Sequence, residues 1–120
     1  MPVTSDTVQS WLDAYVDAWR SNEVAKIGAL FTADVVYRFR PFEKPLIGRD
    51  AVVAAWLDVD DPPGSWQADY QVWAVSEDRA AATGRTTYAS GAIFHNVFLL
   101  RFRDGACCEY TEWFVEEPAE

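Results

Sequence analysis

Basic residues are scarce in this chain of 120 residues: ten Lys and Arg stand against nineteen Asp and Glu, which gives a formal net charge of -9. Nucleic acid and anionic membrane surfaces both attract clustered Lys and Arg, so the composition speaks against either partner. No apolar run approaches the length of a membrane span, and residues 1–6 show no basic stretch followed by an apolar one. We therefore expect neither a nucleic-acid nor a membrane partner.

Cysteine and histidine are also rare. The two cysteines are the neighbours Cys107 and Cys108, whose side chains point to opposite faces of a strand and are poorly placed to form a disulfide. Reduced thiols are typical of the cytosol, so we expect a cytoplasmic protein. His95 is the single histidine, and no CxxC, HExxH, P-loop, GxGxxG or GxSxG motif accompanies it. We expect no metal ion and no other cofactor.

Aromatic side chains are abundant, at 15% of the residues with six Trp, which is enough for a core and for a lined cavity. Helical periodicity predicts three helices, over residues 5–20, 23–31 and 49–57. Alternation and turn signals predict a short β-run at 35–40 and four strands near 67–76, 79–89, 93–103 and 106–115. The predicted fold class is α+β, with three N-terminal helices packed in the concave face of one curved, mainly antiparallel sheet, as a single domain over residues 1–120.

The predicted turns place one polar row across this sheet. Two-residue turns at 77–78 and 90–91 pair Tyr70 with Arg85 and Arg85 with Asn96, and a three-residue turn with a glycine bulge at 103–105 pairs Asn96 with Glu112. A buried charge is costly unless it meets an opposite charge, so Arg85 and Glu112 are a candidate site. A shifted register that places His95 opposite Glu112, as a general base, stays open.

The other face of the sheet is too apolar for a surface left in water. This register places the following side chains on it: Trp73, Val75, Tyr88, His95, Val97, Leu99, Thr111 and Trp113. Burial against a second copy of the chain is the natural interpretation, so we predict a homodimer through Trp73, His95, Val97, Leu99 and Trp113.

Four segments of the chain resemble the nuclear transport factor 2 superfamily, most closely its SnoaL-like branch, which includes relatives of steroid delta-isomerase and limonene epoxide hydrolase. They are residues 11–19 (WLDAYVDAW), 29–37 (ALFTADVVY), 47–52 (IGRDAV) and 100–105 (LRFRDG). The resemblance implies a cone of three helices over a curved sheet, a pocket at the open end, and dimers. It says little about activity, because one fold of this kind hosts enzymes and non-enzymes.

Residue by residue, the resemblance carries over incompletely. Tyr15 matches the tyrosine of the isomerase pattern, but Phe39 stands where its general-base aspartate falls and Phe98 where its oxyanion-stabilising acid falls. These departures speak against steroid isomerase chemistry. Arg85 could act as the arginine of the epoxide hydrolases, although Thr87 replaces one of the flanking acids.

Two functions remain open. In the first, the protein is a cofactor-independent isomerase, cyclase or hydrolase of a small hydrophobic molecule, with Glu112, Arg85 and Tyr15 as catalytic residues. In the second, the same cup binds a hydrophobic ligand, or serves as an interaction module, without chemistry. The expected binding residues are Tyr70, Asn96, Trp19, Tyr37, Phe39, Trp56, Phe98, Tyr110 and Phe114. Arg85 and Glu112 are equally well interpreted as a buried structural ion pair, and the aromatic residues as core.

Overall fold

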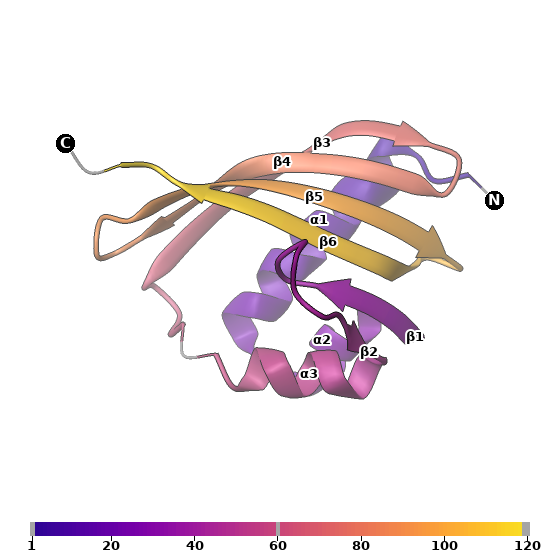
Figure 1. Ribbon diagram of the computed structural model, residues 1–120, viewed down its shortest axis with the longest axis horizontal. Helices are drawn as coiled ribbons and strands as arrows, with labels where there is room; N and C mark the ends of the chain where they lie inside the picture. Colours follow the sequence, from indigo (N-terminus) through magenta and orange to yellow (C-terminus); the bar gives the residue numbers. More distant parts are fainter. Residues whose placement is uncertain (1, 60, 119–120) are drawn as a thin grey trace.

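The computed structural model describes residues 2–59 and 61–118 and confirms the predicted α+β class. Figure 1 shows a curved sheet arching over three helices. The helices are α1 (Ser5–Ser21), α2 (Val24–Ala29) and α3 (Arg49–Leu57). The strands are β1 (Phe31–Arg38), β2 (Leu46–Ile47), β3 (Trp66–Ser76), β4 (Arg79–Tyr88), β5 (Ile93–Arg103) and β6 (Ala106–Glu116). No helix in the described ranges is both long enough and apolar enough to cross a membrane.

Helix α1 begins at a capping box. The Thr4 hydroxyl accepts a hydrogen bond from the Thr7 amide, while the Thr7 hydroxyl accepts one from the Thr4 amide. Helix α1 buries one face, formed by Val8, Trp11, Leu12, Tyr15 and Ala18. It therefore carries Tyr15 into the interior beneath the sheet.

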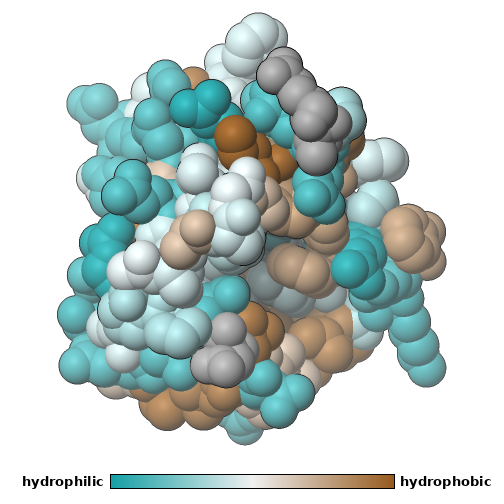
Figure 2. Space-filling view, turned by 90° about the vertical axis from the view of Figure 1, so that its left-hand side faces the viewer, coloured by the Kyte–Doolittle hydropathy of each residue, from teal (hydrophilic) through white to brown (hydrophobic). Residues whose placement is uncertain are grey.

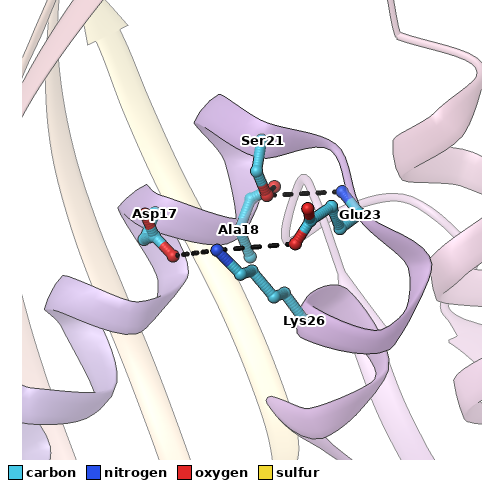
Figure 3. Close-up of polar contacts among 5 residues, drawn as sticks. All are labelled: Asp17, Ala18, Ser21, Glu23 and Lys26. Carbon is cyan, nitrogen blue, oxygen red and sulfur yellow. Dashed lines mark hydrogen bonds and ion pairs between the residues drawn. The ribbon is translucent and has the colours of Figure 1, made fainter.

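The junction between α1 and α2 is tight (Figure 3). Asn22 adopts a left-handed conformation with φ 56° and donates its amide hydrogen to the Ala18 carbonyl, which ends α1. Lys26 then reaches back from α2, with its Nζ 3.0 Å from Oδ2 of Asp17 and 3.4 Å from Oε2 of Glu23. These ion pairs are exposed and contribute little stability.

The six strands form one sheet in the order β2-β1-β6-β5-β4-β3. Strand β1 runs parallel to β6, whereas the other neighbours are antiparallel. Strand β1 is longer than the predicted run and takes in Phe31, which sequence periodicity had assigned to the second helix. The sheet is open and does not close into a barrel. The three helices lie against one of its faces, and the other face carries no helix (Figure 1).

The pairing of β3 with β4 departs from the predicted register. Ser76 faces Arg79, as the predicted turn requires, but the register shifts between Val72 and Ala74. Trp73 is the extra residue of this bulge, and beyond it every pair moves by one position. Tyr70 consequently faces Gly84, and the predicted pairing of Tyr70 with Arg85 is wrong.

The turn between β4 and β5 is one residue longer than predicted. The Tyr88 amide donates a hydrogen bond to the Ala92 carbonyl across a turn in which Gly91 has φ 98°. The predicted pairing of Ala89 with Ala92 therefore does not form. Arg85 therefore faces His95 and not Asn96, which is opposite Gly84.

The last hairpin combines a two-residue turn with a bulge. Asp104 and Gly105 both have positive φ, of 53° and 83°, which matches the mirror-image turns that suit antiparallel hairpins. The register then shifts between Arg101 and Phe102, and Glu112 faces Phe98. Neither the preferred partner of Glu112, Asn96, nor the alternative, His95, is correct.

These shifts invert the predicted faces of β4. Thr86 is buried beneath the sheet, whereas Arg85 and Thr87 are exposed. Three residues predicted on the outer face, Val75, Tyr88 and Thr111, are half-buried. On β5 and β6 the predicted faces are correct, because the hydrophobic alternation there is strong. Those strands bury Asn96, Phe98, Tyr110 and Glu112 and expose His95, Val97, Leu99 and Trp113.

Candidate functional site

Glu112 lies beneath the sheet in an almost completely buried position, with 5% of its surface exposed. Two side chains donate to its carboxyl group. The Tyr110 hydroxyl lies 2.6 Å from Oε1, and Nδ2 of Asn96 lies 2.8 Å from Oε2. Both donors come from the strands that bear the strongest alternation, β6 and β5, so the sheet itself fixes the three groups.

Each of these donors is part of a longer chain of hydrogen bonds. The Tyr15 hydroxyl lies 2.9 Å from that of Tyr110; since Tyr110 donates to Glu112, Tyr15 must donate to Tyr110. We call this the tyrosine arm.

On the other side, the Thr86 hydroxyl donates to Oδ1 of Asn96 at 2.9 Å, and the Tyr70 hydroxyl lies 2.5 Å from that of Thr86. We call this the threonine arm. Both arms end at the same carboxyl group, Glu112, and present hydrogens to it.

The pKa of Glu112 reflects its burial. Loss of water raises it from 4.5 to about 7, and the hydrogen bonds from Tyr110 and Asn96 oppose the rise. Among the ion pairs formed within residues 2–59 and 61–118, none includes Glu112. A carboxyl group that exchanges its proton near neutral pH is suited to acid–base chemistry.

Arg85 does not reach this site. It is exposed on the outer side of the sheet, between Asp69 of β3 and His95 of β5 in the strand register. The predicted contact of Arg85 with Glu112 is therefore wrong, and Thr86 occupies the inward position on β4. Sequence reasoning missed Thr86, and the Gly84 that precedes it offered a signal, because a glycine inside a strand often marks a close approach of the neighbouring strand.

Aromatic rings fill the space around the network. The Tyr15 ring packs edge-on against Trp56 at 5.0 Å, and Tyr37 stacks on Tyr110 at 4.3 Å. The Trp56 indole donates to the Tyr37 hydroxyl at 3.2 Å. Burial raises the pKa of Tyr15, Tyr37 and Tyr110, so these phenols stay protonated and neutral. At these positions the aromatic rings themselves fill the interior beneath the sheet.

Most of the predicted binding residues meet in this region. The structure brings together Tyr15, Tyr37, Trp56, Tyr70, Asn96, Phe98, Tyr110 and Glu112. Phe39 and Phe114 form a separate cluster with Phe94, at 5.4 and 5.8 Å between rings, and Phe39 is exposed. Trp19 stacks on Trp66 at 3.5 Å.

The end of the molecule that carries the β4–β5 turn is hollowed. Figure 2 views this end and shows a recess with hydrophobic residues at its margins. Asn96 lies near the start of β5 and Glu112 in the later half of β6, so the network lies on the half of the sheet nearer this recess (Figure 1). The recess and the network therefore lie toward the same end of the molecule (Figure 1).

Two further cavities lie away from Glu112. One, of about 290 Å³, lies between α2 and α3 and is bordered by Val24, Val53 and Leu57. The other, of about 420 Å³, is a groove on the outer face of the sheet beside Leu99 and Arg101. Within the described ranges, no group of three or more His, Cys, Asp or Glu side chains is arranged to hold a metal ion.

The fold has many solved relatives at low sequence identity. A ketosteroid isomerase-like protein from Kribbella flavida superposes with a TM-score of 0.75 at 19% identity, over 97% of this chain and 83% of that one. An NTF2-like protein of unknown function from Burkholderia xenovorans gives 0.74 at 16% identity, over 96% and 87%. An LEH-like epoxide hydrolase from M. tuberculosis gives 0.67 at 11% identity, over 92% and 84%.

These identities show a shared fold and nothing about activity. No curated protein matches the chain. The family model of the SnoaL-like domain matches residues 12–110, which include most of α1, all of α2 and α3, and five complete strands with the first half of the sixth. The chain belongs to the SnoaL-like domain family.

Proposed function

We propose that the protein is a cofactor-independent enzyme in which Glu112 transfers a proton to and from a small hydrophobic molecule. The observation that carries this proposal is the burial of one carboxyl group, with a pKa of about 7, at the meeting point of two hydrogen-bonded arms. A structural role alone would favour a less costly group, because an unpaired buried carboxylate destabilises a fold.

Of the three reaction types that the family resemblance suggests, isomerisation makes the fewest demands on this site. One carboxylate can take a proton from a carbon next to a carbonyl, while the electrons of the broken C–H bond move to the carbonyl oxygen. The same carboxyl group then returns the proton to a different carbon. Hydrolysis requires a second acid or base to activate water or protonate a leaving oxygen, and Glu112 is the one buried carboxyl group among the described residues.

The tyrosine arm meets the second requirement, stabilisation of the developing negative charge on oxygen, when the substrate oxygen replaces Glu112 or Tyr110 as the acceptor of one of its hydrogens. Tyr15 and Tyr110 are neutral phenols in a nearly dry environment, where a hydrogen bond to an oxyanion is worth more than in water. Since rings now fill the space, a substrate must displace one of them. Trp56 is only partly buried and packs on Tyr15, so it is the ring best placed to move.

The test is turnover by the wild type and by Glu112→Gln, with two sets of probes. Cyclic β,γ-unsaturated ketones are followed by the ultraviolet absorbance of the conjugated product, and cyclic 1,2-epoxides by diol formation. Loss of about 100-fold or more in kcat for ketone isomerisation in Glu112→Gln supports the proposal. Thr87→Val, an exposed substitution on β4, is the control and keeps full activity. Equal turnover by Glu112→Gln and the wild type would refute the role of Glu112.

The filled interior favours a second candidate, ligand binding without chemistry. Tyr15, Tyr37 and Tyr110 are buried, and the Tyr110 ring contacts the other two, as in a core that opens only to accept a ligand. In that case a cyclic ketone would quench tryptophan fluorescence and be recovered unchanged. Recovery of a rearranged ketone favours the enzyme.

We also propose that two copies of the chain associate through the outer face of the sheet. The exposed apolar residues on this face are Trp73, Val97, Leu99, Trp113 and Val115. Together they form a larger apolar surface than a monomeric protein normally leaves in water.

A further inference from the structure

The orientation of the Asn96 amide determines whether a hydrogen-bond donor or an acceptor faces the Glu112 carboxyl group. An amide presents a donor on one side and an acceptor on the other, and turning it over exchanges the two. With Nδ2 toward Glu112, the carboxylate gains a donor at 2.8 Å. With the oxygen in that place, two acceptors would face one another at the same distance, which disfavours the ionised form of Glu112.

Thr86 is the group that selects between these two arrangements. Its hydroxyl lies 2.9 Å from Oδ1 of Asn96 and has a single hydrogen to give. When that hydrogen points to Asn96, the amide must keep its oxygen toward Thr86 and its NH₂ group toward Glu112. The direction of the Thr86 hydroxyl therefore sets the direction of the amide.

Tyr70 in turn fixes the direction of the Thr86 hydroxyl. The two oxygens lie 2.5 Å apart, so one must donate to the other. A phenol is more acidic than an aliphatic alcohol, which makes it the better donor and the poorer acceptor. Tyr70 therefore donates to Thr86, and the Thr86 hydrogen is left free for Asn96.

Gly84 leaves room for the Tyr70 ring because it has no side chain. Gly84 is the direct cross-strand partner of Tyr70, and a Cβ atom at this position would lie 2.5 Å from Cδ1 of the Tyr70 ring. The ring thus lies against the bare backbone of β4, where its hydroxyl reaches Thr86. The whole arm is defined by strand pairing and does not depend on a loop.

We propose that Thr86 and Tyr70 are positioning residues that hold the Asn96 amide with its NH₂ group toward Glu112. The inference rests on the proposed role of Glu112 as the proton-transfer group, and it extends that role to side chains that do not touch the carboxyl group. Without the arm, the amide is free to turn and the carboxylate loses its directed donor.

The titratable groups that face Glu112 from the surrounding elements are all phenols. They are Tyr15 of α1, Tyr37 of β1, Tyr70 of β3, Tyr88 of β4 and Tyr110 of β6. The pKa of each is raised, chiefly by burial, so none of them changes charge near neutral pH. A titration of Glu112 in this range therefore reports on Glu112 and its two donors.

The test is the pKa of Glu112, measured by carbon NMR on protein labelled at the glutamate carboxyl carbons, with Glu112→Gln to identify the signal. Thr86→Val keeps the shape of the side chain and removes the hydroxyl, and Thr86→Ser keeps the hydroxyl. We expect Thr86→Val to raise the Glu112 pKa by about half a unit or more. Thr86→Ser and the exposed control Thr87→Val should stay within about 0.2 units of the wild type.

Tyr70→Phe provides an independent variant if Thr86→Val does not fold. It removes only the phenolic oxygen, and we expect a rise in the Glu112 pKa that is smaller than in Thr86→Val. An unchanged pKa in Thr86→Val or, where that variant does not fold, in Tyr70→Phe overturns the positioning role.

The experiment also separates this inference from the proposed function. If the Glu112 pKa is unchanged in Thr86→Val while Glu112→Gln loses turnover, the catalytic role of Glu112 is retained and the positioning role of Thr86 and Tyr70 is refuted. If the Glu112 pKa is raised in Thr86→Val while Glu112→Gln keeps full turnover, the positioning role of Thr86 and Tyr70 is retained and the catalytic role of Glu112 is refuted.

Discussion

At the scale of single residues, Glu112 links the stability of the protein to pH. Its pKa is about 7 in the folded protein and 4.5 in an ordinary environment. Between these two values the folded protein keeps the proton that the unfolded chain has released. The free energy of unfolding therefore falls as the pH rises through this window. The contribution is fully present below pH 4.5 and is lost above pH 7.

Glu112→Gln removes this dependence, because glutamine is neutral at every pH. Relative to the wild type, we expect the variant to gain about 3 kcal/mol in unfolding free energy between pH 4.5 and pH 8. Urea denaturation at a series of pH values measures the difference. A constant difference across the series would mean that Glu112 titrates as an exposed glutamate does.

The sequence identified part of this site for a physical reason. On β5 and β6, polar residues interrupt a strong apolar alternation, so Asn96 and Glu112 stand out as inward-facing. Strand β4 has no such alternation: its sequence is AAATGRTTY over residues 80–88. Alanine, threonine and glycine fit either face, so the choice between Arg85 and Thr86 depended on a register that sequence could not fix.

At the scale of elements, the hairpin of β3 and β4 depends on a glycine. An alanine Cβ at position 84 would lie 2.1 Å from the Asp69 carbonyl oxygen and 2.8 Å from Cα of Tyr70. These atoms belong to the backbone of β3 and cannot turn aside, so the strands would have to separate.

Gly84→Ala should therefore destabilise the protein by about 2 kcal/mol or more, measured as the shift of a urea unfolding curve. Gly28→Ala is the matched control. Its new methyl group would meet only Cδ of Arg49 at 3.7 Å, and alanine favours the helix α2, so we expect the same stability or a gain of up to about 1 kcal/mol. Equal effects of the two substitutions would contradict the close approach of β3 and β4 at Gly84.

The elements themselves were predicted better than their pairing. The helices and long strands begin and end within a few residues of their predicted limits, because periodicity and turn residues are local signals. Bulges are less local. Trp73 is the extra residue of one bulge and Cys108 that of the other, and each bulge moves all later pairs by one position.

At the scale of the whole molecule, the packing of the helices against one curved sheet followed from the order of the elements, helices first and strands afterwards. The parallel pairing of β1 with β6 did not follow, since it joins the two ends of the chain and leaves no turn between them to read. The outer apolar face is the other property of the whole molecule. Trp73 is 74% exposed there and Trp113 51%.

If this face joins two copies, the wild type should have twice the 13.5 kDa mass of one chain in light scattering after size-exclusion chromatography. Trp113→Asp should give the mass of one chain, because a carboxylate would be buried without a partner at the interface. Phe42→Asp changes an aromatic residue that is 83% exposed in the β1–β2 loop and should leave the mass unchanged. A wild type with the mass of one chain would rule out the interface.

The central position of β6 has a consequence for biosynthesis. β6 is the last described element to leave the ribosome, yet it lies between β1 and β5 and carries Tyr110 and Glu112. Until it emerges, β1 lacks its long neighbour and the apolar sides of α1 and β5 have no complete cover. The sheet therefore cannot be completed, and β1 cannot join β5 through β6, until almost all of these residues have been translated.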